Sequence, residues 1–163
     1  MEVVRIRLNL SVMSEEHAKE ICIWEYDGEY SVYNLSDWET VVRNNWDLAV
    51  KEKRESNFLS VSKDQELVAY GVITNVADTV ILGIGLKPKL CGKGLGKDIM
   101  KLLIEESKLR FPYTPIALEV RTFNKRAIKC YESIGFEIRK RYRRDTPTLK
   151  NAEFYYMDYL KTK

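Results

Sequence analysis

The sequence is poor in cysteine and has almost no histidine. Its 163 residues include three cysteines and one histidine. The cysteines (Cys22, Cys91 and Cys130) are odd in number and form no Cys-x-x-Cys pair, which argues against a disulfide framework and against a zinc site. We therefore expect no bound metal and a reducing, cytoplasmic environment.

Long apolar runs are also missing. The longest ones, such as residues 79–86, are far shorter than the roughly 20 residues that span a bilayer. Residues 1–10 alternate apolar and charged side chains and lack the basic start and apolar stretch of a secretory signal. We expect no membrane partner, and we interpret residues 3–10 as a strand.

The charge excess is too small to indicate nucleic-acid binding. The chain has 27 lysines and arginines against 24 aspartates and glutamates, which gives a net charge of +3. The basic run at 139–144 is expected to form an exposed strand or loop face. With 45% hydrophobic and 31% charged residues, the chain has an ordinary globular composition. Its length predicts one domain over residues 1–163, as a monomer or a homodimer.

Hydrophobic periodicity predicts helices first and strands later in the N-terminal half. Ser14 is a suitable cap for a short helix, and Ser36-Asp37 is expected to open a second helix that runs to about Glu55. Alternating strands follow, over residues 58–62, 66–74 and 79–86.

Helices and strands alternate in the C-terminal half. The pattern predicts a helix at 95–109, a strand at 116–121, a helix from the Asn124 cap to 134, and strands at 136–142 and 152–159. The fold class is therefore α/β, or α+β in strict usage. We expect a mixed, mostly antiparallel central sheet with helices on both faces.

A glycine-rich segment, Cys-Gly-Lys-Gly-Leu-Gly-Lys at residues 91–97, follows a strand and precedes a helix. Glycines allow the backbone to approach an anion, and the free N–H groups of the first helical turn favour a pyrophosphate. The Walker pattern fails because Asp98 follows Lys97, and the Gly-x-Gly-x-x-Gly pattern of dinucleotide sites fails as well. The alternative is a tight turn between the strand and the helix.

A second segment has the form of a strand, a capped helix and a glycine exit. Glu119 lies on the strand, Asn124 at the cap, and Tyr131 on the helix before Gly135. Each residue also has an ordinary structural interpretation. Tyr131 could be a packed tyrosine, Asn124 only a cap, and Glu119 a solvated charge or a partner of Arg121.

Together the two segments resemble the GNAT superfamily of acetyl-CoA-dependent N-acetyltransferases. The resemblance covers about residues 72–160 and includes the pattern Asn-x-x-Ala-x-x-x-Tyr-x-x-x-Gly-Phe at residues 124–136. The family loop usually begins with Arg or Gln where this chain has Cys91, so backbone amides must carry more of the phosphate binding. Leu-Glu-Val-Arg at 118–121 and the tail at 141–157 resemble bacterial enzymes that acetylate ribosomal-protein N-termini.

The resemblance implies that the chain binds acetyl-CoA (coenzyme A) and acetylates a primary amine by direct attack. It makes Tyr131 the general acid and Glu119 the candidate base. It also implies a strand end that separates from its neighbour and pairs with the pantetheine arm; Gly83 and Gly85 suit a bulge there. The implied cofactor-binding residues are Ile84, Gly85, Leu86, Cys91, Gly92, Lys93, Gly94, Leu95, Gly96, Lys97, Asn124, Ala127 and Tyr131.

An aromatic segment lies where the family's substrate-contacting elements fall. It contains Trp24, Tyr26, Tyr30 and Tyr33, which we predict to contact the acceptor. The acceptor is expected to be an amine-bearing small molecule, peptide or protein. A module that binds CoA without transferring acetyl is the alternative.

Overall fold

A computed structural model describes residues 7–160, and within it the chain forms two compact units. The N-terminal unit runs to Gly71 and includes Gly85–Cys91, whereas the C-terminal unit comprises Val72–Ile84 and the chain from Gly92 onward. Two strands, β3 and β4, contribute residues to both units. The single domain expected from length stays a prediction.

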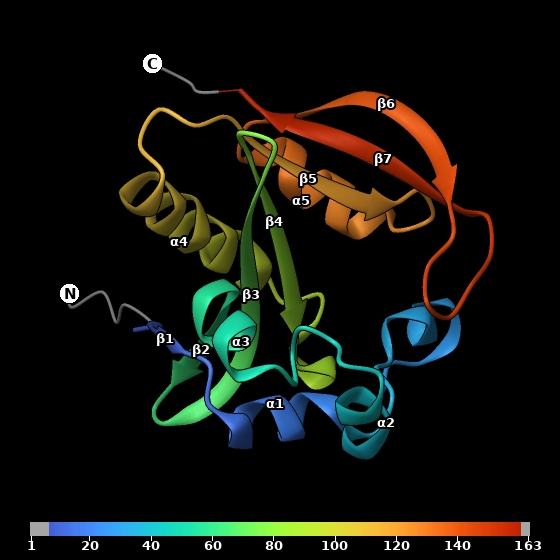
Figure 1. Ribbon diagram of the computed structural model, residues 1–163. Coiled ribbons are helices and arrows are strands. Elements are labelled where there is room, and N and C mark those ends of the chain that lie inside the picture. The colour runs from blue at the N-terminus through green and yellow to red at the C-terminus, as the bar shows by residue number, and fades with distance from the viewer. Residues whose placement is uncertain (1–6, 161–163) are drawn as a thin grey trace. The chain divides into compact units, whose positions relative to one another are not determined.

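Seven strands, five α-helices and two short 3-10 helices make up the described chain (Figure 1). In order they are β1 (Asn9–Val12), α1 (Glu15–Cys22), η1 (Gly28–Tyr33), α2 (Trp38–Arg43), α3 (Lys51–Asn57), β2 (Phe58–Lys63), β3 (Glu66–Val76), β4 (Thr79–Leu86), η2 (Pro88–Leu90), α4 (Leu95–Arg110), β5 (Ile116–Arg121), α5 (Lys125–Ser133), β6 (Phe136–Arg144) and β7 (Ala152–Tyr159). The strand order in the sheet is β1-β2-β3-β4-β5-β7-β6.

The sheet is mixed and mostly antiparallel, as predicted. β1 with β2, β5 with β7 and β6 with β7 pair antiparallel, and β4 with β5 pairs parallel. The parallel pair is joined through α4, since parallel strands need a crossover.

In the N-terminal unit the predicted helix from 36 to 55 is wrong: it is two helices, α2 and α3. A Schellman motif ends α2, because Asn45 adopts a left-handed φ of 52°. The Trp46 N–H donates to the Val41 carbonyl at 3.1 Å, and the Asn45 N–H donates to the Val42 carbonyl at 3.1 Å. The first helix, by contrast, begins as expected, because the Ser14 hydroxyl accepts from the His17 N–H at 3.1 Å.

The core of the N-terminal unit is built from α1, α2 and the first strands. Its buried members are Met13, Ala18, Ile21, Cys22, Trp24, Val41, Leu48 and Leu67. Tyr70 packs against this core and approaches Gly85 so closely that a Cβ there would lie 2.2 Å from its ring. Gly85 is therefore needed in this unit to admit the Tyr70 ring.

In the C-terminal unit, α4 and α5 accompany β5, β7 and β6 (Figure 1). Ile99, Met100 and Leu103 of α4 are fully buried, as are Leu118 of β5 and Met157 of β7. A register shift between Ile138 and Lys140 interrupts the pairing of β6 with β7. The long β6–β7 pair carries Tyr142 stacked on Phe154, with ring centroids 6.0 Å apart.

Most predicted strands agree closely with the observed ones. Those at 79–86, 116–121 and 152–159 have the observed bounds. Of the strand expected at 3–10, residues 3–6 lie outside the described part. Within that part the observed strand is Asn9–Val12, which includes the last two residues of the prediction and extends two residues further. No helix within residues 7–160 is long and apolar enough to cross a membrane.

Candidate active site

The glycine-rich loop of the C-terminal unit leads directly into α4. Gly94 has a left-handed φ of 81° and occupies the N-cap position of this 16-residue helix. The cap has no side-chain hydrogen bond, so no side chain caps the N–H groups of the first turn. Because the helix dipole adds positive potential at this end, the loop is suited to an anion.

The space and charge around the loop fit a pyrophosphate. A Cβ at Gly94 would meet no atom within 4 Å, and a Cβ at Gly92 would lie 3.3 Å from Arg126 Nη1. Lys93 and Lys97 are exposed beside the glycines. Open space next to Gly94 and a guanidinium near Gly92 are what an anionic ligand of this size needs, so the residues present fit acetyl-CoA.

Arg126 is a cation that sequence reasoning missed. It lies in the first turn of α5, yet its guanidinium approaches the loop that precedes α4. This arrangement can replace the arginine that the loop itself lacks at Cys91. The Cys91 thiol, in the N-terminal unit, is half-buried and donates to the Lys87 carbonyl at 3.8 Å.

Helix α5 begins at its predicted cap. The Asn124 side-chain oxygen accepts from the Ala127 N–H at 3.2 Å, so both residues have a structural role at the helix start. One turn later Tyr131 is half-buried, and its ring meets the edge of Phe136 at a centroid distance of 6.0 Å. A direct part for Asn124 and Ala127 in cofactor binding stays a prediction.

Glu119 lies on β5 and is held by an arginine of β6. Both carboxylate oxygens accept from Arg144, at 2.8 Å from Nη2 and 3.1 Å from Nε. This pair fixes the orientation of the carboxylate, and the hydrogen bond raises the pKa of Arg144, so the arginine stays protonated at every working pH. The partner of Glu119 is thus Arg144, and Arg121 has no ion pair with it.

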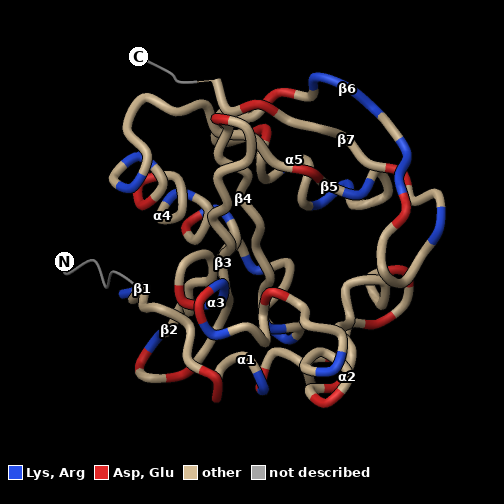
Figure 2. The backbone as a smooth tube through the Cα atoms, in the orientation of Figure 1, with Lys and Arg blue, Asp and Glu red and all other residues tan. Residues whose placement is uncertain are grey.

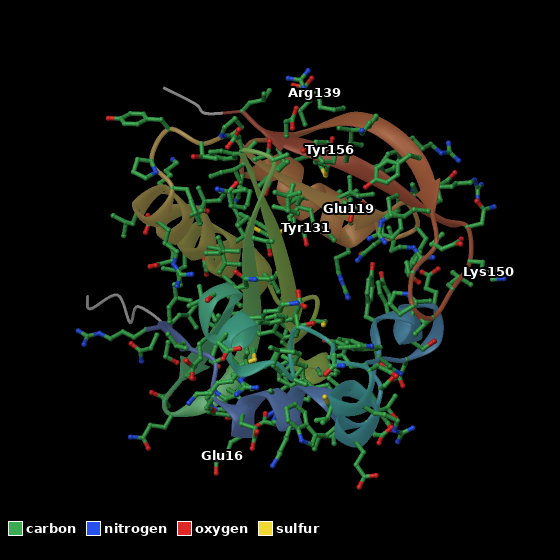
Figure 3. The ribbon with its side chains drawn as sticks, in the orientation of Figure 1. Glu16, Glu119, Tyr131, Arg139, Lys150 and Tyr156 are labelled. Atoms are coloured by element: carbon green, nitrogen blue, oxygen red, sulfur yellow. The ribbon has the colours of Figure 1, made fainter. Side chains whose placement is uncertain are left out.

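Tyr156 lies directly opposite Glu119, on β7 (Figure 3). Burial raises the pKa of Tyr156, with further contributions from the charges of Asp158 and Glu119. Tyr156 is therefore a protonated phenol beside the candidate base. In the sequence, the only signal for Tyr156 and Arg144 was the two-residue periodicity of their strands. The strand pairing was needed to identify both as neighbours of Glu119.

Strand β4 pairs with β5 only at its beginning. The register runs from Val80 with Ile116 to Leu82 with Leu118 and ends there. Beyond this point Gly83 and Ile84 belong to a part of β4 without a partner in β5, which agrees with the predicted separation of the two strands. Glu119 follows Leu118 at the point where the pairing ends.

In the N-terminal unit, the end of β4 is occupied by tyrosines. The Tyr26 hydroxyl donates to the Leu86 carbonyl at 2.5 Å, and burial raises the pKa of this phenol. Tyr70 packs against Gly85, and burial raises its pKa to about 12. One main-chain acceptor of the predicted cofactor strand is thus already used within this unit.

The aromatic segment folds into η1 and its flanks. Trp24 is a core residue, 7% exposed, whose ring lies 6.1 Å from that of Tyr70. Tyr33 contacts Tyr26 edge-on and stacks with Tyr30, with ring centroids 6.3 and 6.4 Å apart. Because Trp24 is buried, only the three tyrosines stay predicted contacts of the acceptor.

The chain belongs to the acetyltransferase (GNAT) family, whose model matches residues 18–136. It is 35% identical over 88 residues to the ribosomal protein bS18-alanine N-acetyltransferase of Salmonella typhimurium, a match covering 52% of this chain and 59% of that enzyme. The matched region thus spans little more than half the length of this relative.

Solved structures share the fold over nearly the whole chain. A chimera of the Vibrio cholerae spermidine N-acetyltransferase SpeG and hSSAT has a TM-score of 0.73 at 16% identity, covering 94% of this chain and 95% of that one. The protein yncA of Salmonella typhimurium, solved with acetyl-CoA, has a TM-score of 0.68 at 17% identity, covering 93% of this chain and 92% of that one. These likenesses show the GNAT fold.

Proposed function

We propose that this protein is an acetyl-CoA-dependent N-acetyltransferase that acetylates a primary amine by direct attack. Family membership supports the reaction class. The observation that carries the cofactor assignment is the open, uncapped Gly94 turn before α4, with Arg126 close to Gly92. A fold neighbour that holds acetyl-CoA adds support.

The cofactor would be held chiefly by the glycine loop. Main-chain N–H groups of residues 94–97 bind the pyrophosphate, and Arg126, Lys93 and Lys97 add positive charge. Ile84, Gly85 and Leu86 remain the proposed contacts of the pantetheine arm. When bound, acetyl-CoA supplies the activated acetyl thioester.

Two residues of the C-terminal unit are proposed to handle protons. Tyr131 is the general acid, whose phenol can donate a proton to the departing thiolate. Glu119 is the base, accepting a proton from the amine directly or through a water. Arg144 is the positioning residue that holds its carboxylate.

The amine most easily served by such a base is an α-amino group. With a pKa of about 8 it is roughly 10% neutral at pH 7, whereas deprotonating a lysine of pKa about 10.4 costs about 4.6 kcal/mol. The Salmonella relative acetylates an alanine of a ribosomal protein. An N-terminal or small primary amine is thus the proposed acceptor, in the cytoplasm, with the enzyme a monomer or homodimer.

One observation favours the alternative, a module that binds CoA without transfer. The bidentate pair with Arg144 occupies both oxygens of Glu119, so the proposed base is already engaged. In that case acetyl-CoA would bind and no amine would be acetylated.

Thiol release from acetyl-CoA, measured across a panel of amines and peptides, separates the two. We expect release above the buffer rate with at least one class of primary amine and a matching mass increase of the acceptor. Binding of acetyl-CoA without release for any class would support the binding module.

A further inference from the structure

One face of the C-terminal unit combines cations with aromatic rings around Glu119. Residues directly opposite in paired strands project to the same side. Between β5 and β7, Arg121 lies opposite Phe154, and Glu119 lies opposite Tyr156. Between β6 and β7, Tyr142 lies opposite Phe154, and Lys140 lies opposite Tyr156. We call this the β5–β7–β6 face; its members besides Glu119 are Arg121, Lys140, Tyr142, Arg144, Phe154 and Tyr156.

The arginines of β6 that lie off this face already have carboxylate partners. Arg141 and Arg143 both pair with Glu153, at 2.7 and 3.1 Å, and Arg139 pairs with Asp158 at 3.0 Å. Figure 2 shows β6 as a run of basic positions. Most of that charge is thus neutralised within the unit.

Arg121 and Lys140 differ, because neither has a carboxylate partner within residues 7–160. Arg121 lies over the rings of Phe123 and Phe154, at 5.3 and 5.5 Å, and its Nε is buried without a hydrogen-bond partner. Lys140 lies 5.5 Å from the Tyr142 ring centroid and 5.3 Å from that of Tyr156. Aromatic rings hold both cations but leave their charges unpaired.

The face therefore carries an uncompensated positive charge. It has three cations and one carboxylate, and Glu119 neutralises only Arg144, which crosses over Phe154 at 4.4 Å. A carboxylate is a natural ligand for a guanidinium that is already stacked on a ring. A second positive charge near Glu119 would be repelled.

We infer that the acceptor is a primary amine that carries carboxylate groups, which bind Arg121 and Lys140 while the amine reaches Glu119. This inference rests on the proposed function and narrows its substrate class. Both acidic peptides and free dicarboxylic amino acids have the required chemistry. Polyamines and basic N-termini, whose further positive charges the face repels, are disfavoured.

The test compares dye-labelled peptides of equal length that begin with alanine and continue with acidic, neutral or basic residues, with unlabelled aspartate as competitor. Binding by fluorescence anisotropy and thiol release from acetyl-CoA are both measured. Exposed ion pairs are individually weak, so two of them should give about a tenfold preference for the acidic peptide, which salt reduces. Competition by aspartate would extend the class to free amino acids, and its absence would restrict it to peptides.

Adjacent residues of β6 provide a matched pair of variants. Lys140→Gln should lose about half of the preference for the acidic peptide, measured as the logarithm of the affinity ratio. Arg141→Gln removes the same charge beside Glu153 and should retain the full preference. Arg121→Gln should act as Lys140→Gln does. Equal binding of the three peptides, or equal losses in Lys140→Gln and Arg141→Gln, would overturn the inference while thiol release still upheld the acetyltransferase. A preference for the acidic peptide without any thiol release would support the acidic ligand of this face and contradict the acetyltransferase.

Discussion

At the scale of single residues, Tyr131 is a packed side chain and also the proposed general acid, and only the hydroxyl oxygen distinguishes the two roles. Its ring packs edge-on against Phe136, a contact that does not need the hydroxyl. The proposed proton donation, by contrast, depends on the hydroxyl. Tyr131→Phe should therefore lower kcat by about 10²- to 10⁴-fold and leave the KM for acetyl-CoA nearly unchanged, as steady-state kinetics will show.

A surface tyrosine gives the control for this change. Tyr113 is fully exposed in the turn after α4, so Tyr113→Phe should leave kcat intact. Retention of more than half of the wild-type kcat in Tyr131→Phe would mean that another group, such as a water or Tyr156, protonates the thiolate.

Glu119 and Glu153 are two carboxylates that arginines of β6 hold in similar ways. Glu119 pairs with Arg144, and Glu153 pairs with Arg141 and Arg143. Only Glu119 is proposed to accept a proton in the reaction. Glu119→Gln should flatten the acidic limb of the pH–rate profile, with a larger loss for a lysine-like acceptor than for an α-amino acceptor.

Glu153→Gln is the matched control, because it removes an equivalent ion pair. The pKa of Glu153 is lowered, first by the hydrogen bond from Arg141, so its contribution to stability is present above the ordinary glutamate pKa and is lost as pH falls. Glu153→Gln should change acid stability and keep the shape of the pH–rate profile. An unaltered profile in Glu119→Gln would move the search for the base to Glu25 and Glu29.

Sequence reasoning identified residue types better than partners. Glu119 was placed correctly on a strand face opposite to Leu118 and Val120, because strand alternation is local. Arg144 lies 25 positions away and reaches Glu119 only because β7 brings β5 and β6 together. Arg126 next to Gly92 is a similar case, since the contact depends on how α5 meets the loop.

At the scale of elements, the turn that opens α4 can be tested directly by substitution. Gly94 combines a φ of 81° with empty space at its Cβ. Asparagine tolerates this conformation, so Gly94→Asn adds a side chain with little backbone strain. It should raise the KM for acetyl-CoA at least about tenfold by obstructing the pyrophosphate, with a much smaller effect on kcat.

Another glycine with left-handed backbone gives the control. Gly28 has a φ of 58° and also has no atom within 4 Å of a Cβ, but it lies in η1 of the N-terminal unit. Gly28→Asn should leave the KM for acetyl-CoA unchanged. Equal KM values in Gly94→Asn and the wild type would remove the pyrophosphate from this turn.

Elements with strong local signals were predicted best. The Asn124 cap and the Ser14 cap are both observed as hydrogen bonds, because capping depends on residues three positions apart. The helix expected at 36–55 was wrong for a local reason as well. The Asn44-Asn45 pair favours a left-handed exit, and that signal outweighed the helical periodicity around it.

At the scale of the whole molecule, the net charge of +3 hides an uneven distribution. β6 alone carries five cations at 139–144. Four of them form ion pairs with three carboxylates of β5 and β7, and Lys140 forms none within residues 7–160. This self-pairing explains why a basic run need not indicate nucleic acid. Composition could not show it, since pairing across strands requires the fold.

Binding of acetyl-CoA should stabilise the whole protein. A ligand that binds only the native state adds RT ln(1 + [L]/Kd), which is about 2.7 kcal/mol at 100 times the Kd. For a chain of this size that corresponds to a rise in Tm of about 5–10 °C. The measurement is a thermal melt at increasing acetyl-CoA concentration, followed by a probe of folded structure.

Acetyl-pantetheine separates the two ends of the cofactor in the same melt, because it has the thioester arm but no pyrophosphate. If the turn at Gly94 holds the pyrophosphate, the fragment should raise Tm much less than acetyl-CoA, and the melt of Gly94→Asn should respond to both ligands about equally. An unchanged Tm at millimolar acetyl-CoA would remove the cofactor assignment. A full shift with the fragment alone would show that binding energy comes from the arm, and the loop would then be only a turn between β4 and α4.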